Sequence, residues 1–259
     1  MPIHFFKFHG TGNDFVIINK IKNPNINLSE SAIKLICDRK FGIGADGLMY
    51  LLPSDQYDFE MKYYNSDGKE GTMCGNGGRC IVRFAKMLGI IENEAKFLAI
   101  DGVHKARIEK DIVRLKMIDV KKITKFVDGY FIDTGSPHFV KLYNNLKEIN
   151  IEEFGRKLRY DSRFDPKGVN VNFVEEKPQE TEFATYERGV ERETLSCGTG
   201  AVATAIVLKH SSAVGKYKVK LKTKGGKLTV HFEKTDINNY SDIWLEGEAK
   251  FVFEGQINL

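Results

Sequence analysis

The apolar positions of the chain fall into short stretches separated by glycine, proline, asparagine and aspartate, which predicts many strands and few helices. In the first half of the chain, strands are expected at residues 3–8, 14–19, 48–52 and 61–64. Residues 95–118 alternate between apolar and polar side chains around turn signals, so they predict a β-meander. The expected strands of the second half are 129–133, 138–143, 169–175, 181–187, 217–223, 227–233 and 242–246.

One helix is expected between the second and third strands. Ser29 is placed to cap its N-terminus, because a serine side chain accepts a hydrogen bond from the first helical amides. We expect this helix to run through Arg39, with Ile33, Leu35 and Ile36 as its apolar side.

Three further helices are expected: one from Cys74 to near Gly89, one at 151–159 and one at 201–208. The last of these is apolar on all sides, which predicts that it is buried all round. A helix enclosed by strands in each half of the chain is the simplest architecture that buries it.

The chain contains one motif twice. Cys74-Gly75-Asn76-Gly77-Gly78-Arg79-Cys80 recurs as Cys197-Gly198-Thr199-Gly200-Ala201, and each copy places a cysteine before a glycine-spaced turn that opens a helix. The two cysteines are 197 − 74 = 123 residues apart. This spacing suggests a repeat longer than 100 residues, as two domains would show.

Other segments recur at nearly the same offset. They are Thr11-Gly12-Asn13 with Thr134-Gly135-Ser136 (136 − 13 = 123), Asp101-Gly102-Val103 with Lys224-Gly225-Gly226 (225 − 102 = 123), and Tyr64 with Tyr186 (186 − 64 = 122). The last pair places one extra residue in the second copy, before its cysteine. Several matches in one order indicate an internal duplication.

These features predict an α/β (α+β) protein of two pseudo-symmetric domains, each a β-barrel-like sheet wrapped around a central helix. One domain is expected to span residues 1–118 and 248–259 and to carry Cys74, and the other to span 119–247 and to carry Cys197. Residues 249–258 predict an extra strand without a counterpart in the repeat, which returns to the first domain.

Composition narrows the class of protein. The length of 259 residues fits two domains, and 42% hydrophobic and 29% charged residues are ordinary globular values. The net charge of +4 is small and the lysines are scattered, so nucleic acid is not an expected partner. No apolar run is long enough for a membrane span, and the N-terminus has no signal-peptide core. We therefore expect a soluble cytoplasmic protein.

Four cysteines are too few for a disulfide scaffold of this size, and they lack the paired Cys-x-x-Cys spacing of structural zinc sites. Neither they nor the histidines have metal-ligand spacing, so no metal is expected. Gly42-x-Gly44-x-x-Gly47 matches a dinucleotide fingerprint by letter. That fingerprint needs a strand before it and a helix after it, and the order expected here is the reverse.

The two cysteine motifs fit a specific chemistry. A helix N-terminus presents unpaired N–H groups and the positive end of a dipole, and glycine lets a ligand approach the backbone closely. Such a site binds a carboxylate and favours a thiolate. Two such sites would provide a thiolate base and a thiol acid around one bound carboxylate. That pair suits removal of a proton α to the carboxylate and its return on the opposite face.

Each candidate also has an ordinary structural explanation. Either cysteine alone is typical of a small buried residue at a helix start, and Cys37 and Cys80 are expected to belong to the core. Glu187-Arg188 is also typical of a solvated charge pair, and His138 is placed in a turn where a structural histidine fits equally well. The asparagines at positions 13, 65 and 170 fall at expected turns or strand ends, where asparagine is common for structural reasons alone.

At this point the sequence resembles the diaminopimelate epimerase family over nearly its whole length. The resemblance rests on both cysteine motifs and on six further segments, in the family's order. These are Phe8-His9-Gly10-Thr11-Gly12-Asn13-Asp14-Phe15, Gly42-Ile43-Gly44-Ala45-Asp46-Gly47, Asn65-Ser66-Asp67-Gly68, Gly135-Ser136-Pro137-His138, Val169-Asn170-Val171 and Tyr186-Glu187-Arg188-Gly189.

The resemblance implies a cofactor-free, two-base epimerase that interconverts LL- and meso-2,6-diaminopimelate, an amino-acid substrate of lysine and peptidoglycan synthesis. It implies an active site in a cleft between two similar domains, and a homodimer. It also assigns residue roles. The acid/base pair is Cys74 and Cys197. The residues that surround the reacting carboxylate are Gly75, Asn76, Gly198 and Thr199, and the other substrate contacts are Asn13, Asn65, Asn170 and Arg188, with Glu187 at the amino group. His138 and Glu187 are expected to tune catalysis.

The sequence departs from the commonest family pattern in three places. Ser136 stands where asparagine usually precedes Pro-His, Gly47 stands where some members have glutamine, and one residue is added between Gly189 and Glu193. Three alternatives stay open: a related racemase or isomerase acting on another amino acid, a small-molecule binding protein that uses the site without chemistry, and a thiol redox protein. Exchange of a substrate α-proton with solvent separates them.

Overall fold

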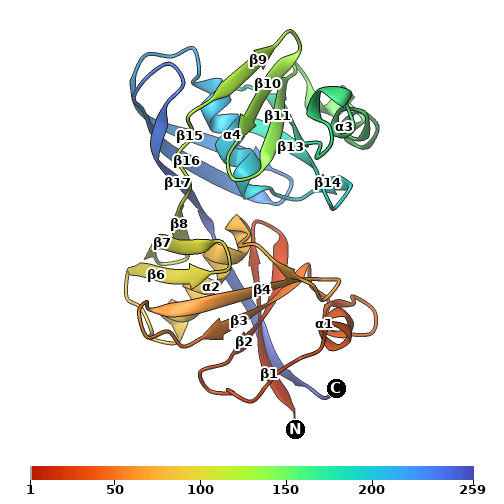
Figure 1. Ribbon diagram of the computed structural model, residues 1–259, viewed down its shortest axis with the longest axis vertical. Helices are drawn as coiled ribbons and strands as arrows, with labels where there is room; N and C mark the ends of the chain where they lie inside the picture. Colours follow the sequence, from red (N-terminus) through yellow and green to blue (C-terminus); the bar gives the residue numbers. More distant parts are fainter. Residues whose placement is uncertain (1) are drawn as a thin grey trace. The chain divides into compact units, whose positions relative to one another are not determined.

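The computed structural model describes residues 2–259 and divides them into two compact units (Figure 1). Unit 1 is formed by the chain up to Leu115 together with Gly247–Leu259, and unit 2 is formed by Lys116–Glu246. The boundaries expected from the sequence lie within three residues of these limits. Among residues 2–259, no helix is long and apolar enough to cross a membrane.

Unit 1 is a sheet with two crossover helices. Its elements are β1 (Ile3–Gly10), β2 (Asn13–Asn19), α1 (Glu30–Cys37), β3 (Gly47–Leu52), β4 (Phe59–Asn65), β5 (Glu70–Gly71), α2 (Gly75–Met87), β6 (Glu94–Ala99), β7 (Gly102–Glu109), β8 (Ile112–Lys116) and β18 (Lys250–Ile257). Most neighbouring strands are antiparallel, but β2–β3 and β4–β6 are parallel. Parallel neighbours need a long connection, and α1 and α2 provide the two connections.

Unit 2 repeats this plan. Its elements are β9 (Ile123–Phe126), β10 (Gly129–Asp133), β11 (Pro137–Leu142), η1 (Leu146–Glu148), α3 (Ile151–Arg159), η2 (Ser162–Phe164), β12 (Asn170–Glu175), β13 (Thr181–Glu187), β14 (Arg192–Thr194), α4 (Gly198–Leu208), β15 (Gly215–Thr223), β16 (Gly226–Lys234) and β17 (Tyr240–Glu248). Its parallel pairs are β11–β12 and β13–β15, and they are connected through α3 and α4. The duplicated architecture is therefore confirmed strand by strand.

Strand register fixes the residue equivalence of the two units. Phe15 pairs with Gly47 in unit 1, and His138 pairs with Asn170 in unit 2. Both steps equal the offset of 123 found between the cysteines (138 − 15 and 170 − 47). The added residue lies in the turn between β13 and β14, because Tyr64 pairs with Glu70 whereas Tyr186 pairs with Glu193, one position further along.

One of the sequence matches is wrong by a residue. Gly102 has a φ of +122° and opens β7, and Gly226 has a φ of +143° and opens β16. The counterpart of Gly102 is therefore Gly226 and not Gly225. Positive φ at this turn favours glycine, and the sequence alone did not show which of two adjacent glycines takes it.

The helices α2 and α4 lie against the inner faces of their sheets, as predicted. Figure 1 shows α4 enclosed by the strands of unit 2. Nine of the eleven residues of α4 are buried, among them Val202 and Ile206, which belong to the apolar core of the unit. Complete burial of one such side chain stabilises the fold by about 1.5–3 kcal/mol.

Side chains of strand β1 pack on both faces of the sheet of unit 1. Its side chains alternate, so that Phe6 meets Phe84 of α2 at a ring-centroid distance of 4.7 Å. Phe5 points to the opposite face, into the cluster that contains Ile33 and Ile36 of α1. Unit 1 therefore has one apolar layer on each side of its sheet.

The first helix is shorter than predicted. Ser29 caps it as expected, by accepting a hydrogen bond from the amide of Ala32 at 3.3 Å. The helix ends at Cys37 instead of Arg39, because Asp38 takes an extended backbone and its carboxylate accepts from the next turn. Leu35, expected on the apolar side, is 45% exposed.

Residues 249–258 form a strand of unit 1, as predicted, and pair with β1 from Ile3↔Ile257 to His9↔Lys250. The expectation that this strand has no counterpart is wrong. In unit 2, β9 lies antiparallel beside β10 as β18 does beside β1. The match could not be found by a constant offset in the sequence, because β9 comes directly before β10, whereas β18 comes at the end of the chain, after the whole of unit 2.

Candidate active site

Each cysteine motif forms a helix N-terminus. Cys74 is the residue that precedes α2, with φ −90° and ψ 133°, and Cys197 precedes α4, with φ −125° and ψ 115°. Both cysteines therefore have an extended backbone, and the first amide groups of the helix follow directly after them. Cys74 is partly buried, and Cys197 is 6% exposed. Both sulfur atoms lie at the positive end of a helix dipole, where a thiolate is stabilised.

In unit 1, two asparagines surround Cys74. The Cys74 thiol donates to Asn13 Oδ1 at 3.6 Å, and Asn76 Nδ2 donates to the same oxygen at 3.1 Å. Asn13 Nδ2 donates in turn to Asp46 Oδ2 at 2.7 Å. The structure thus brings together three predicted site residues and adds Asp46, which the sequence analysis did not single out.

A charged cluster holds Asp46 and the start of β2. Asp14 forms ion pairs with Lys7 and Arg39, both at 2.7 Å, and Arg39 also contacts Asp46 at 2.8 Å. Burial raises the pKa of Asp14, but the hydrogen bonds from Arg39 and Lys7 outweigh it and lower the pKa to about 2. Asp14 is therefore ionised across the neutral range, and Asp46, which Arg39 holds beside it, fixes the position of Asn13 through a hydrogen bond.

Arg79, in the first turns of α2, is fully buried. Its guanidinium donates to the carbonyl of Gly75 at 3.2 Å, to Thr11 Oγ1 at 3.1 Å and to Asn76 Oδ1 at 3.0 Å. The sequence analysis treated Arg79 only as part of the motif. The sequence did carry a sign of this burial, because Arg79 stands between glycines and an apolar helix segment. Arginine is rarely found in such a setting unless polar groups satisfy it.

In unit 2, neutral side chains form a relay to Cys197. Cys197 Sγ lies 3.5 Å from Thr199 Oγ1, which lies 2.9 Å from His138 Nε2. His138 Nδ1 lies 2.9 Å from Asn172 Nδ2, and Thr185 Oγ1 donates to Asn172 Oδ1 at 2.7 Å. This order assigns the tautomer: Asn172 donates to Nδ1, so Nε2 carries the proton and donates to Thr199. The Thr199 hydroxyl is then directed to the sulfur.

His138 lies on strand β11, as the strand expected at 138–143 required, and is fully buried. The placement of this residue in a turn after Pro137 is wrong. Burial and the nearby charge of Arg188 lower the pKa of His138 to about 3, against the opposing hydrogen bond from Asn172. The ring is therefore neutral at physiological pH. Thr199 Oγ1 lies between this ring and Cys197 Sγ, so His138 has no direct contact with the sulfur in this arrangement.

Glycine lets this relay pack against the helix. A Cβ atom on Gly200 would lie 2.7 Å from Asn172 Oδ1 and 3.1 Å from Thr185 Oγ1. The backbone of α4 at Gly200 therefore packs directly against Asn172 and Thr185, and a larger residue would not fit there. Gly198, like Gly200, is buried, and Thr199 is partly buried between them.

Four residues of unit 2 meet at the strand ends beside His138. Asn170 Nδ2 donates to Ser136 Oγ at 2.7 Å and to the carbonyl of Pro137 at 3.1 Å. Asn170 Oδ1 accepts from the backbone N–H of Arg188 at 2.9 Å. Ser136, the departure from the family pattern, is thus bonded directly to a predicted substrate contact.

The remaining predicted residues lie at strand ends. Glu187 is the last residue of β13 and is partly buried, and Arg188 follows it, also partly buried. Asn65 ends β4 and is exposed, outside the hydrogen-bonded group around Cys74. Asn13, Asn65 and Asn170 each lie at the first or last position of a strand, in keeping with the turn character expected from the sequence.

The prediction that Cys37 and Cys80 belong to the core is confirmed. Cys37 is 4% exposed and Cys80 is fully buried. Burial raises the pKa of Cys37 to about 12 and shifts that of Cys80 strongly in the same direction. Neither thiol is a nucleophile or base at neutral pH.

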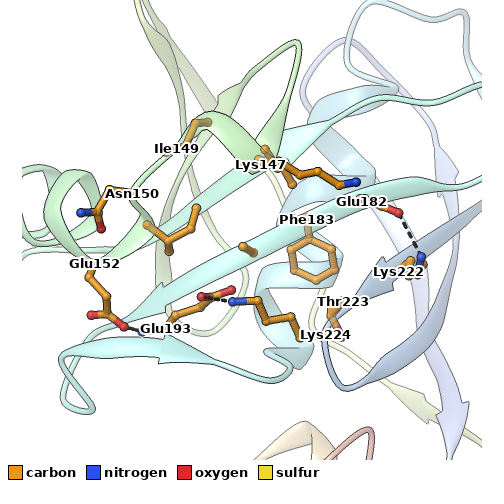
Figure 2. A pocket seen from close by; sticks show the side chains of 13 residues that line it. Lys147, Ile149, Asn150, Glu152, Glu182, Phe183, Glu193, Lys222, Thr223 and Lys224 are labelled. Atoms are coloured by element: carbon orange, nitrogen blue, oxygen red, sulfur yellow. Dashed lines mark hydrogen bonds and ion pairs between the residues drawn. The ribbon is translucent and has the colours of Figure 1, made fainter.

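Unit 2 contains a groove of about 490 Å³ over Phe183. Figure 2 shows the side chains that line it, with ion pairs such as Lys224–Glu193 at 2.5 Å along its border. None of the predicted site residues lines this groove. A second hollow of about 560 Å³ is lined by Arg188, Gly135 and Pro137, so it borders the predicted substrate contacts.

Comparison with known proteins identifies the family of the chain. The family model described as diaminopimelate epimerase matches residues 5–122 and 130–252. The chain belongs to the diaminopimelate epimerase family. The resemblance drawn from the motifs is thereby confirmed, and the enzyme class that it implies is an isomerase.

Curated relatives match over nearly the whole chain. A diaminopimelate epimerase of Flavobacterium psychrophilum is 46% identical over 254 residues, covering 97% of this chain and 99% of that protein. One of Aquifex aeolicus is 37% identical over 278 residues, covering 99% and 98%. The epimerase family is thus matched in full length and not through one unit alone.

Solved structures share the fold at low identity. A phenazine biosynthesis protein of the PhzF family from Bacillus anthracis superposes with a TM-score of 0.77 at 14% identity, covering 100% of both chains. A hydroxyproline epimerase from Agrobacterium vitis gives 0.68 at 16% identity, covering 99% of this chain and 91% of that one. The epimerase fold is therefore shared by proteins of different chemistry, so the site residues must decide the reaction.

Proposed function

We propose that this protein interconverts LL- and meso-2,6-diaminopimelate by a cofactor-independent, two-base mechanism in which Cys74 and Cys197 are the acid and base. The observation that carries the proposal is that the duplicated units each place a cysteine at the N-terminus of an equivalent buried helix. Membership of the diaminopimelate epimerase family supplies the substrate.

The reaction needs two proton transfers. One cysteine, as thiolate, removes the proton from the α-carbon, and the other, as thiol, delivers a proton to the opposite face. The negative charge that develops on the substrate carboxylate is stabilised by amide groups of Gly75, Asn76, Gly198 and Thr199. The two cysteines end the cycle with their protonation states exchanged.

Polar side chains are proposed to fix the rest of the substrate. Arg188 binds the distal carboxylate, because a guanidinium grips a carboxylate through two parallel hydrogen bonds. Asn13, Asn65 and Asn170 contribute further contacts, and Glu187 binds an amino group. His138 tunes Cys197 through Thr199, to which it is bonded at 2.9 Å.

We further propose that the two compact units are the domains of the duplication, that the enzyme works without pyridoxal phosphate as a homodimer, and that it acts in the cytoplasm. Light scattering of the purified protein tests the dimer. A mass of one 29.4 kDa chain at assay concentrations contradicts it.

Exchange of the substrate α-proton with deuterated solvent tests the proposed reaction. The purified enzyme without added cofactor is expected to incorporate deuterium at the α-carbon while LL- and meso-diaminopimelate interconvert. Proline and hydroxyproline serve as control substrates and are expected to stay unlabelled. Exchange of a control substrate alone favours the related racemase, and no exchange on any substrate favours a binding protein.

A further inference from the structure

Arg79 is a buried cation without an acidic partner. Its side chain is completely inaccessible, and no carboxylate among residues 2–259 forms an ion pair with it. Its acceptors are a carbonyl, a hydroxyl and an amide oxygen, at 3.0–3.2 Å. Its Nε atom has no hydrogen-bond partner in the described structure.

Such an arrangement is costly unless a negative charge compensates for it. Removing a cation from water costs several kcal/mol, and neutral acceptors recover only part of that cost. The guanidinium stays protonated even here, because arginine keeps its proton in proteins. A compensating anion is therefore expected close to Arg79.

The thiol of Cys74 is the suitable group. Arg79 binds the carbonyl of Gly75, the residue next to Cys74, and also Asn76, which shares Asn13 Oδ1 with the Cys74 thiol. The Arg79 charge interacts electrostatically with both Cys74 and Cys80, and Cys80 is too deeply buried to ionise. The same contacts hold the turn that is proposed to bind the carboxylate.

We propose that Arg79 is a positioning residue that stabilises the thiolate form of Cys74 and has no equivalent at Cys197. The position that corresponds to Arg79 is 79 + 123 = 202, which is Val202, buried in the core of unit 2. Unit 2 thus has an apolar side chain at the helix position where unit 1 has a buried guanidinium. This inference rests on the proposed function of Cys74.

Other titratable groups near the start of α2 have partners of their own. They are Asp14 with Lys7 and Arg39, Asp101 with His104, Arg83 with Asp111, Lys250 with Glu248, and His9, whose ring accepts from the amide of Gly12. Arg79, which has no carboxylate partner among residues 2–259, therefore keeps its charge close to the turn that carries Cys74.

Alkylation of the substrate-free enzyme with iodoacetamide across a range of pH tests the proposal. Peptide mass spectrometry follows Cys74 and Cys197 separately, and the pH at half-maximal rate reports each thiolate. In the unaltered enzyme the Cys74 midpoint is expected below that of Cys197. In Arg79→Met it should rise by about one pH unit or more, while the Cys197 midpoint stays.

Two further variants separate charge from packing. Arg79→Lys keeps the charge and is expected to keep a low Cys74 midpoint, even if turnover falls. Arg83→Met, one turn along α2 and paired with Asp111 at the surface, is the matched control and should leave the midpoint unchanged. A folded Arg79→Met protein with an unmoved Cys74 midpoint overturns the proposal.

The unaltered enzyme tests the proposal even if Arg79→Met does not fold. A Cys74 midpoint equal to or above that of Cys197 overturns the proposal without any variant. The proposed function fails separately, through the absence of α-proton exchange on diaminopimelate. An Arg79-dependent midpoint in an enzyme without exchange would leave the electrostatic role standing and remove the epimerase assignment.

Discussion

The two cysteine helices share a backbone but differ in what supports them. In unit 1 the start of α2 is held by a buried charge, Arg79, and by asparagines. In unit 2 the start of α4 is held by neutral groups, His138 and Asn172. The same offset that aligns the cysteines places Phe15 opposite His138, Met49 opposite Asn172 and Val202 opposite Arg79.

The difference shows which parts of a duplicated site can diverge. The glycine-spaced turn and the helix N-terminus are retained in both units, because they present the amide groups and the dipole. The side chains behind them are free to differ, provided that each buried polar group is satisfied. A reaction that uses one acid and one base has no need for identical surroundings.

The largest expected effect comes from removing either sulfur atom. Cys74→Ala and Cys197→Ala should each lower kcat for diaminopimelate epimerisation by about 10²–10⁴-fold or more, because one proton transfer then lacks its donor or acceptor. Circular dichroism should show both variants folded. Near-normal turnover by either variant would contradict the two-base proposal.

The control for this experiment is Cys80→Ala. Cys80 is fully buried in α2, six residues after Cys74. The variant should lose only packing energy and retain most activity. A folded but inactive Cys80→Ala enzyme would mean that the wrong cysteine of the first motif carries the chemistry.

Arg188→Lys is expected to have the next largest effect. Lysine cannot form the paired hydrogen bonds of a guanidinium with a carboxylate, so KM for diaminopimelate should rise by about 10–100-fold with a smaller change in kcat. Arg192→Lys is the matched control, since Arg192 is exposed on the neighbouring strand β14. An unchanged KM in Arg188→Lys would remove Arg188 from the distal carboxylate.

Asn172→Met gives unit 2 the residue that unit 1 has at the equivalent position. The change leaves His138 Nδ1 and the Thr185 hydroxyl without their partner, which should cost about 1–3 kcal/mol of unfolding free energy. Urea unfolding measures the loss. Met49→Leu is the control and should cost less than about 1.5 kcal/mol. Equal losses of unfolding free energy in the two variants would show that the hydrogen bonds of Asn172 do not stabilise unit 2.

The last prediction concerns pH. The pKa of His138 is about 3 in the folded protein and 6.5 in an unperturbed histidine, so the unfolded chain binds the proton first as pH falls. His138 therefore contributes stability that is fully present above about pH 6.5 and is lost as pH falls toward 3, by up to about 1.4 kcal/mol per pH unit. His138→Gln should show a shallower loss of unfolding free energy between pH 6.5 and 4. An identical slope in both proteins would mean that His138 is not buried as described.

Local patterns gave most of the fold. Strand and helix positions, the buried helix α4 and the return of the last strand to unit 1 follow from periodicity and turn residues. Short elements were missed, because β9 has four residues and β5 has two, too few for a pattern. The end of α1 was also missed, since it depends on which amides the carboxylate of Asp38 accepts from.

The site divides in the same way. Motifs identified Cys74, Cys197 and the glycine turns, because they are contiguous in sequence. The side chains behind them were found only in three dimensions. Asn172 lies in a strand of buried residues, and its role depends on the parallel pairing of β11 with β12, which brings distant segments together. The burial of Arg79 likewise depends on packing of α2 against the sheet.

Strand β18 has a consequence for how the protein is made. The strands of unit 2, from β9 to β17, follow one another along the chain without a segment of unit 1 between them. Unit 1 lacks the outer neighbour of β1 until Lys250–Ile257 has left the ribosome, after every residue of unit 2. Because domains fold as units during synthesis, the half that is translated first is the last to be finished. Until then β1 presents an open edge along the residues that later pair with β18, and a nascent chain paused between the two segments would carry a complete second half beside an incomplete first one.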